Sequence, residues 1–280
     1  MIADTESTMT RKTVLVTGAG GGVATFLRTE LAGRFNLRLS DRVPLKDLRG
    51  GESFVAADLT DMVAVRRAVE GVDAIVHLGA FSVEGSWEVI RDANIIGTHN
   101  LYEAAKQAGV RRLVFASSNH AVGFCERSET IDHTVYPRPD SRYGLSKVFG
   151  EALASLYADK YGVQSLCLRI GNVAERPLDV RRLAIWISSR DLAQLVAIGI
   201  EHPDIHFEVV YGMSDNKRAW WDNANAYRLG YRPEDHSEDY AMDVLATCPS
   251  ETGDPVADRH QGGSFCSTEA GGDPTKPDLV

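Results

Sequence analysis

Cysteines and basic residues are scarce in this sequence, and each shortage excludes a class of function. The four cysteines are far apart and form no Cys-x-x-Cys pair, so we expect neither a metal site nor a disulfide framework. They are Cys125, Cys167, Cys248 and Cys266. Lysine and arginine total 30 against 39 aspartate and glutamate, a net charge of −9. A nucleic acid or an anionic membrane would need a basic face, so neither partner is expected.

Long apolar runs are also absent. No segment reaches the roughly 18 apolar residues of a membrane span, and the first dozen residues contain no apolar core of signal-peptide length. The default expectation is therefore a cytoplasmic protein with reduced thiols. At 280 residues and 44% hydrophobic composition, the chain is long enough for one large core.

Short apolar runs alternate with amphipathic stretches along the first 170 residues. Such alternation predicts βαβ units and an α/β fold, a doubly wound parallel sheet covered by helices on both faces. The expected strands are 13–17, 37–40, 54–56, 74–78, 112–117 and 165–169. The expected helices between them are 23–31, 62–70, 90–107 and 141–161.

The alternation becomes irregular after residue 169. We expect a helix at 191–200 and a strand at 207–210 to build a small C-terminal substrate-binding cap. From residue 249 onward the chain is rich in Gly, Pro and Asp, which is typical of a tail or an irregular segment. The predicted organisation is one domain over 1–280, with a dinucleotide-binding core at 12–172, a small substrate-binding part at 173–265, and flexible tails at 1–11 and 266–280.

The stretch VLVTGAGGGVATFL joins the first strand to the first helix through a glycine-rich turn. Gly18, Gly21 and Ala24 have the G-x-x-G-x-x-A spacing that lets the backbone approach a pyrophosphate at a helix N-terminus. Asp41 closes the second strand, where a carboxylate can accept both ribose hydroxyls and repel a 2′-phosphate. The pattern predicts NAD rather than NADP, although Arg42 could soften that repulsion. A glycine-rich turn with an unrelated acidic residue is the alternative that this strand–turn–helix context disfavours.

Two further strand ends add to the predicted cofactor site. Asp58 and Leu59 follow the third strand, near where an adenine would lie. The fourth strand ends in HLGA, whose small residues would let a cofactor pass. The histidine of this motif, His77, is more typical of a hydrogen-bonded structural residue than of a catalytic one.

The motif YGLSK places Tyr143 and Lys147 four residues apart, on one face of a helix. An ammonium held near a phenol stabilises the phenolate, which would lower a pKa of about 10 so that the tyrosine can act as a general base. The stretch FASSNHAVG puts polar side chains at the end of the fifth strand, where a doubly wound sheet binds ligands. Ser117 and Ser118 would point opposite ways in an extended chain, and we predict that Ser118 reaches the reacting oxygen.

These motifs, together with NIIGTHNLYEAA and RIGN, resemble the extended short-chain dehydrogenase/reductase family over residues 13–172. The resemblance implies a Rossmann-type sheet, with Ser118, Tyr143 and Lys147 as the catalytic set. It also implies an assisting asparagine, Asn94. The cofactor-binding residues that we predict are Gly18, Gly20, Gly21, Gly22, Val23, Asp41, Arg42, Asp58, Leu59, Leu78, Gly79, Ala80, Asn94, Tyr143 and Lys147.

The stretches HLGAFSVE, FASSNHAVGF, RPDSRYGLSKVFGE, WWDN and QGGSF are similar to the uronate dehydrogenases. These are bacterial NAD enzymes that oxidise glucuronate and galacturonate at C1 to aldarolactones, and they assemble as homo-oligomers. The resemblance implies a uronic acid as the small-molecule substrate. It also implies a set of residues that line the sugar, namely Ser82, Ser118, Asn119, His120, Tyr143, Asn172, Arg181 and Phe265. One departure is the asparagine at position 172, where some relatives have serine.

The residues themselves also fit an acidic sugar. A carboxylate needs a fork of donors, and Arg181 or Arg182 could grip it with two hydrogen bonds. The alternative for this pair is a solvated charge patch. His120 could orient a ring hydroxyl or serve the fold, and the tryptophans of WWDN, Trp220 and Trp221, are more typical of packing than of sugar stacking.

Two other functions stay open. A sugar-nucleotide epimerase or dehydratase would share the cofactor half, but such proteins usually carry a longer C-terminal domain to hold a nucleotide. A non-enzymatic cofactor-sensing protein on the same fold would be expected to lack an intact tyrosine/lysine pair. Turnover of free uronates against UDP-sugars would separate these functions.

Overall fold

Seven parallel strands form one continuous sheet in the structure, a computed structural model that describes residues 11–268. The strand order is β3-β2-β1-β4-β5-β6-β9, and every neighbouring pair is parallel. The strands are β1 (Thr13–Thr17), β2 (Asn36–Asp41), β3 (Glu52–Ala56), β4 (Ala74–His77), β5 (Arg112–Ser118), β6 (Gln164–Ile170) and β9 (Phe207–Gly212). The predicted Rossmann-type sheet is therefore confirmed. Of the tails predicted at 1–11 and 266–280, residues 1–10 and 269–280 lie outside the described residues.

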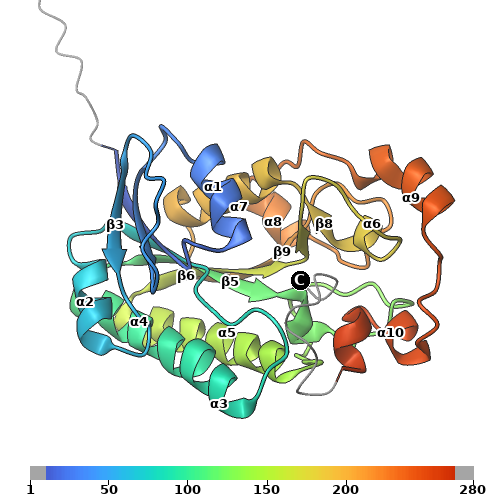
Figure 1. The fold of residues 1–280 in the computed structure, drawn as a ribbon, viewed down its shortest axis with the longest axis horizontal. Coiled ribbons are helices and arrows are strands. Elements are labelled where there is room, and N and C mark those ends of the chain that lie inside the picture. The colour runs from blue at the N-terminus through green and yellow to red at the C-terminus, as the bar shows by residue number, and fades with distance from the viewer. Residues whose placement is uncertain (1–10, 269–280) are drawn as a thin grey trace, which may run out of the picture.

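Helices cover both faces of this sheet (Figure 1). One face carries α1 (Gly22–Glu30) and α7 (Ser189–Glu201), and the other carries α2 (Met62–Val69), α4 (Gly97–Gln107) and α5 (Arg142–Tyr161). The central strand β4 is buried at all four positions. Because both of its faces are covered, its sequence is a nearly continuous apolar run instead of an alternating one.

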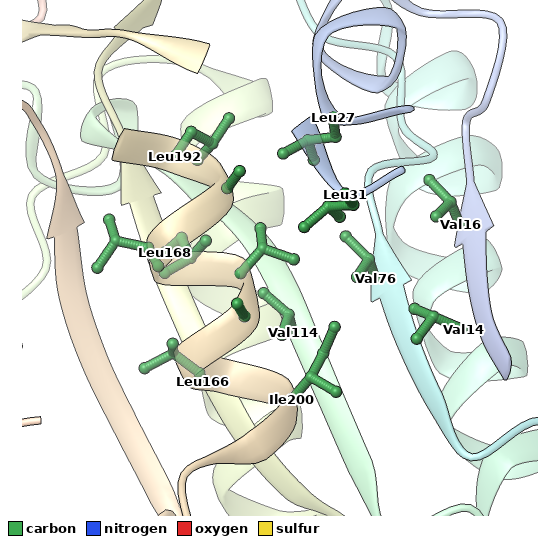
Figure 2. Close-up of a cluster of buried hydrophobic side chains, with 14 of the residues drawn as sticks. Val14, Val16, Leu27, Leu31, Val76, Val114, Leu166, Leu168, Leu192 and Ile200 are labelled. Atoms are coloured by element: carbon green, nitrogen blue, oxygen red, sulfur yellow. The ribbon is translucent and has the colours of Figure 1, made fainter. Parts of the chain in front are cut away.

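Helix α7 belongs to the body of the sheet and not to a cap. Figure 2 shows Leu192 and Ile200 of α7 in the same buried cluster as Leu168 of β6 and Leu27 of α1. The apolar stripe of α7 needs a partner surface, and the sheet between β5 and β6 supplies it.

Strand β9 also extends the main sheet. It pairs in parallel with β6, from Ser165 opposite Phe207 to Ile170 opposite Gly212. The prediction that the helix at 191–200 and the strand at 207–210 build a cap is therefore wrong. Val210 and Tyr211 have no exposed surface, and such residues are typical of a strand covered on both faces.

Short elements gather at one end of the molecule, past β5 and β6 (Figure 1). They include the strand pair β7 (Asn172–Val173) and β8 (Trp186–Ile187), the helices α6 (Arg182–Ile185), α9 (Ala241–Thr247) and α10 (Pro255–Arg259), and the 3₁₀ turns η2 (Asn119–Val122), η3 (Ser237–Tyr240) and η4 (Gly263–Cys266). Helix α8 (Ala224–Arg228) instead packs on β9 of the main sheet. The predicted tail does not begin at 266, because the backbone N–H groups of Ser267 and Thr268 both donate to the carbonyl of Ser264.

The predicted helix at 90–107 is longer and less regular than the sequence suggests. It begins with α3 (Trp87–Ile90) and passes through a π-helical segment, η1 (Arg91–Ile96), before α4. Such segments often occur at functional sites, and here Asn94 is the buried residue of η1. No helix within residues 11–268 has both the length and the apolar character needed to cross a membrane.

Candidate active site

The turn between β1 and α1 is built for close backbone approach. Gly18 has a φ of +69°, and a Cβ atom added to it would lie 2.7 Å from the backbone nitrogen of Gly79. A Cβ on Gly79 would in turn lie 2.8 Å from the side chain of Leu59. No side chain caps the N-terminus of α1, where Gly21 is the N-cap residue. The first N–H groups of this helix can therefore meet a phosphate group.

Asp41 lies at the end of β2 with its carboxylate turned toward the glycine-rich turn. Its Oδ2 accepts a hydrogen bond from the Gly20 N–H at 2.9 Å, and its Oδ1 accepts one from the Arg42 N–H at 2.7 Å. This is the position from which a carboxylate holds the adenosine ribose in dinucleotide-binding folds. The glycine cradle and this carboxylate fit a bound dinucleotide.

The remaining predicted cofactor residues border the same turn. Asp58 is exposed after β3, and two hydrogen bonds from Thr60 hold the pKa of its carboxyl below the usual range. The Leu59 side chain packs closely against Gly79. Gly22 and Val23 open α1, and Leu78 and Ala80 flank Gly79 after β4.

His77 has a structural role. Its Nδ1 lies 2.8 Å from the Thr17 hydroxyl, and its Nε2 lies 3.0 Å from the Thr98 hydroxyl. Burial, and then the charge of Lys147, lower the pKa of His77 to about 3. A neutral imidazole with both nitrogens occupied confirms the structural interpretation.

Ser117 and Ser118 point to opposite sides of β5, as predicted. The Ser117 hydroxyl donates to Glu151 Oε1 of α5 at 2.6 Å. The Ser118 hydroxyl accepts a hydrogen bond from the His120 N–H at 3.2 Å, and its hydrogen bond to Tyr143 acts on that phenol's pKa. Only Ser118 lies with the tyrosine.

Tyr143 and Lys147 are both buried on the same face of α5. The Lys147 ammonium donates to the carbonyl oxygen of Ala116 at 2.7 Å and lies 5.3 Å from the centre of the Tyr143 ring. Burial raises the pKa of Tyr143 to about 12 and lowers the pKa of Lys147 to about 8. The expected lowering of the tyrosine pKa is wrong for the protein alone, because desolvation of the phenolate outweighs the hydrogen bond from Ser118.

Asn94 supports the site from behind. Its Oδ1 accepts the Phe81 N–H at 2.7 Å, and its Nδ2 donates to the Phe81 carbonyl at 3.0 Å and to the Ser146 hydroxyl at 2.9 Å. The amide therefore ties the loop after β4 to α5. Because both of its polar atoms are used in this way, Asn94 keeps that loop in place.

Most of the predicted sugar-lining residues meet around Tyr143. The His120 ring stacks on Phe265 with centroids 3.8 Å apart, and it lies edge-on to the Tyr143 ring at 5.8 Å. With its amide oriented to satisfy both polar atoms, Asn119 accepts from Arg181 Nη2 at 3.0 Å and donates to the Ile170 carbonyl. Ser82 is exposed in the loop after β4, whose neighbouring residues pack beside Tyr143 and Phe265.

Arg181 lies at the edge of these sugar-lining residues, where a backbone carbonyl holds its guanidinium. Its Nε and Nη2 donate to the Gln261 carbonyl at 2.9 and 2.8 Å. Burial, and then the nearby charge of Arg127, lower the pKa of Arg181 to about 10. Within residues 11–268 no carboxylate forms an ion pair with it, whereas Arg182 pairs with Asp179 at 2.8 Å.

One predicted sugar contact has a polar atom without a partner. Asn172 follows β6, and its Oδ1 is buried with no hydrogen-bond partner among the described residues. A buried amide oxygen left unpaired is costly, and a ligand hydroxyl would satisfy it. This atom supports the assignment of Asn172 to the site.

Sequence reasoning missed two residues of this region. Asp140 accepts a 2.6 Å hydrogen bond from His120 Nδ1, yet an acidic residue just before a helix is usually a capping signal. Gln261 has no exposed surface, and its side chain accepts from the Trp221 ring nitrogen at 2.9 Å. Trp221 stacks on Tyr211, so its predicted packing role is confirmed.

Comparison with known proteins adds independent evidence. The NAD dependent epimerase/dehydratase family matches residues 14–207. A uronate dehydrogenase from Pseudomonas putida is 45% identical over 90% of this chain and 94% of that protein. The crystal structure of a mutant uronate dehydrogenase from Agrobacterium tumefaciens, complexed with NAD, has a TM-score of 0.89 at 40% identity and covers 92% of this chain and 98% of that chain. An NAD-dependent glucose-6-phosphate dehydrogenase from Haloferax volcanii is 38% identical over 82% of this chain and 96% of that protein.

Proposed function

This chain belongs to the NAD dependent epimerase/dehydratase family and, within it, to the uronate dehydrogenases, and we propose that it oxidises glucuronate or galacturonate at C1 to the aldarolactone. NAD supplies the hydride acceptor, so that the C1 hydrogen leaves with its electron pair and NADH forms. The C1 hydroxyl proton goes to the protein. Loss of both from a cyclic hemiacetal gives the lactone directly.

The environment of Arg181 is the observation that supports an acidic sugar as the substrate. Its guanidinium is partly buried and forms no ion pair with a carboxylate of residues 11–268. Burying such a charge unpaired is costly, and a bound anion would offset that cost. Asn119 and the Gln261 carbonyl fix its orientation, and Asn119 directly follows Ser118 in the chain. A uronate carboxylate bound there would place the other end of the sugar toward Tyr143.

Tyr143 is the proposed general base. Its phenolate would accept the C1 hydroxyl proton, while the Ser118 hydroxyl donates to the same reacting oxygen. Because burial raises the pKa of Tyr143 to about 12, the phenolate needs a nearby positive charge. Lys147 supplies that charge from the next turn of α5, and Asn94 keeps the facing loop in place.

Cofactor selection belongs to the turn between β1 and α1 and to Asp41. The glycine cradle would receive the pyrophosphate, and the carboxylate would accept the ribose hydroxyls. A 2′-phosphate would face the Asp41 charge, and Arg42 is exposed and bonded to Asp41 through its backbone. We therefore propose NAD rather than NADP as the preferred form.

The experiment is a panel of substrates with purified protein and NAD, followed by NADH absorbance. Glucuronate and galacturonate should be oxidised with a kcat/KM at least about a hundredfold above that of glucose, because only the acids occupy Arg181. Glucose 6-phosphate and UDP-glucose are the competing anions. A higher kcat/KM for glucose 6-phosphate would make the chain a sugar-phosphate dehydrogenase, and conversion of UDP-glucose without net NADH would make it an epimerase.

A further inference from the structure

Asp140 is a carboxylate enclosed by backbone, directly beside the proposed sugar site. Its side chain has no exposed surface. A Cβ atom on either Gly123 or Gly262 would overlap the carboxylate, so two backbone segments close around it. Gly262 donates its N–H to the Gly123 carbonyl at 2.8 Å, which joins those segments. Such enclosure leaves the carboxylate only the partners that the fold provides.

Two side chains form hydrogen bonds that offset the cost of burying this carboxylate, and neither bond comes from the backbone of α5. His120 Nδ1 lies 2.6 Å from Asp140 Oδ2, and the Ser141 hydroxyl donates to Oδ1 at 2.8 Å. The helix cap is made by Ser141, whose hydroxyl accepts the Gly144 N–H. Asp140 is therefore not the cap of α5, and its strong contact is with the histidine.

His120 is fixed on three sides. Phe265 stacks on its ring, Ser118 accepts its backbone N–H, and Asp140 holds Nδ1. The other ring nitrogen, Nε2, has no hydrogen-bond partner among residues 11–268, and the side chain keeps 12% of its surface exposed. One edge of the imidazole is thus left for a ligand.

We infer that Asp140 is a positioning residue for this site, which holds the proton on Nδ1 of His120 and so leaves Nε2 to bind a hydroxyl group of the sugar. The inference rests on the proposed function for the identity of the sugar. An ionised carboxylate only accepts hydrogen bonds, so Nδ1 must carry the proton. In the neutral ring Nε2 is then an acceptor for a sugar hydroxyl.

Charge gives this arrangement a second consequence. The negative charge of Asp140 acts with burial to raise the pKa of Tyr143. A bare carboxylate here would therefore oppose formation of the phenolate, and the hydrogen bond from His120 partly neutralises that charge. Asp140 acts on the chemistry only through its neighbours, which distinguishes it from a catalytic residue.

The first test needs no substrate. Nitrogen NMR of ¹⁵N-histidine-labelled protein, with His120 assigned by its loss in His120→Gln, should show a protonated Nδ1 and a bare Nε2 in the wild type. In Asp140→Asn the amide can present its NH₂ group to the ring, and the proton should move largely to Nε2. A wild-type spectrum with the proton on Nε2 would overturn the inference, even if the Asn variant does not fold.

The second test is a double-mutant cycle on kcat/KM for the preferred uronate. Asp140→Asn should lower kcat/KM by about 10- to 100-fold, mainly through KM, and leave the KM for NAD within about twofold. His120→Ala should cost at least as much. Adding Asp140→Asn to His120→Ala should then cause no further loss, because Asp140 works through the ring. Additive losses would show that Asp140 serves only the fold.

A matched control separates stability from positioning. Asp191 is also fully buried and accepts hydrogen bonds from Ser214 and from the backbone of Glu234, away from the Tyr143 site. Asp191→Asn should lower the melting temperature while kcat/KM changes by less than about twofold.

If the wild type oxidises no uronate, the proposed function fails, and the NMR test still decides the role of Asp140. If uronate is oxidised and the cycle is additive, the positioning role alone fails.

Discussion

At the scale of single residues, Tyr143 and Lys147 form a buried pair whose two pKa values move apart, each away from its ordinary value near 10. Burial disfavours the charged form of each, which raises the pKa of the phenol to about 12 and lowers the pKa of the ammonium to about 8. A phenolate and an ammonium together are less costly to bury than either charge alone. The pair is therefore suited to hold a proton that leaves the substrate.

Tyr143→Phe removes the proposed base without changing the shape of the site. We expect kcat to fall by several decades while the Kd for NAD changes by less than about threefold, because only proton transfer is lost. Stopped-flow turnover and NAD titration measure the two quantities. Tyr157→Phe is the control, since this tyrosine is on the same helix but donates to Glu103. Near-normal turnover in Tyr143→Phe would remove Tyr143 from the mechanism.

Lys147 predicts a specific pH dependence of stability. Its pKa is about 8 in the folded protein against 10.5 for an ordinary lysine, so between these values the unfolded chain binds more protons. This group therefore makes the free energy of unfolding rise with pH across that window, and its cost is fully present below pH 8. Relative to Lys147→Met, the wild type should gain about 2 to 3 kcal/mol from pH 8 to pH 10. Urea unfolding of both proteins gives this difference, and a flat difference would contradict the buried charge.

Asp41→Ala tests cofactor choice. The variant should weaken NAD binding by about tenfold or more and NADP binding much less, because the lost carboxylate bonds a 2′-hydroxyl and repels a 2′-phosphate. Titration with each cofactor gives the two Kd values. Equal losses for both would mean that the ribose is held elsewhere. Asp47→Ala, on the following loop, is the matched surface control.

At the scale of elements, the sequence predicts the first six strands of the sheet to within two residues at each end. It does so because each strand end carries a turn or motif, such as the glycine turn after Thr17 or HLGA at the end of β4. Whether α7 and β9 form a cap or join the main sheet could not be predicted in the same way. The segment from β7 to β8 interrupts the alternation, and an apolar helix followed by a short strand fits a cap as well as a sheet. Only packing against β6 decides between them.

The residues of the site also divide into those that local motifs predict and those that only the fold brings together. Residues that belong to local motifs, such as Ser118, Tyr143 and Lys147, are brought together as predicted. Asp140 and Gln261 were missed because their partners are distant in sequence: His120 is 20 residues from Asp140, and the Gln261 carbonyl bonds Arg181 across 80 residues. The pKa of Tyr143 was missed because helical spacing shows which groups are near but not how much water they lose.

The place of α7 leads to a prediction about the predicted core at 12–172. A fragment that ends at residue 172 lacks β9 and α7, so it exposes Val114, Leu166 and Leu168, which are buried in the full chain. We expect no cooperative thermal transition from this fragment, whereas a fragment of residues 1–268 should melt in one step. Calorimetry compares the two. A cooperative transition in the short fragment would show that the dinucleotide half is an independent domain.

At the scale of the whole molecule, the proposed cofactor site and the proposed sugar site lie along the same edge of the sheet. The turn after β1 and the end of β2 build the cofactor half, while the end of β5 and the elements past β6 build the sugar half. Both lie at the carboxyl ends of parallel strands, which is where doubly wound sheets bind ligands. The chain carries a net charge of −9, so an anionic substrate must be attracted locally, and Arg181, with Arg127 and Arg182 nearby, supplies that charge.

The central claim is that this local charge selects an acid for oxidation at Tyr143. Its most direct test is kcat/KM for the preferred uronate and for glucose, in the wild type, Arg181→Ala, Arg181→Lys and the control Arg182→Ala, which breaks the pair with Asp179. Removing one partner of a buried charge pair costs about 2 to 5 kcal/mol. Arg181→Ala should therefore lower the uronate value by decades and leave the glucose value nearly unchanged, with partial recovery in Arg181→Lys. Equal losses for both sugars would contradict the account, because Arg181 would then be serving the fold or the cofactor.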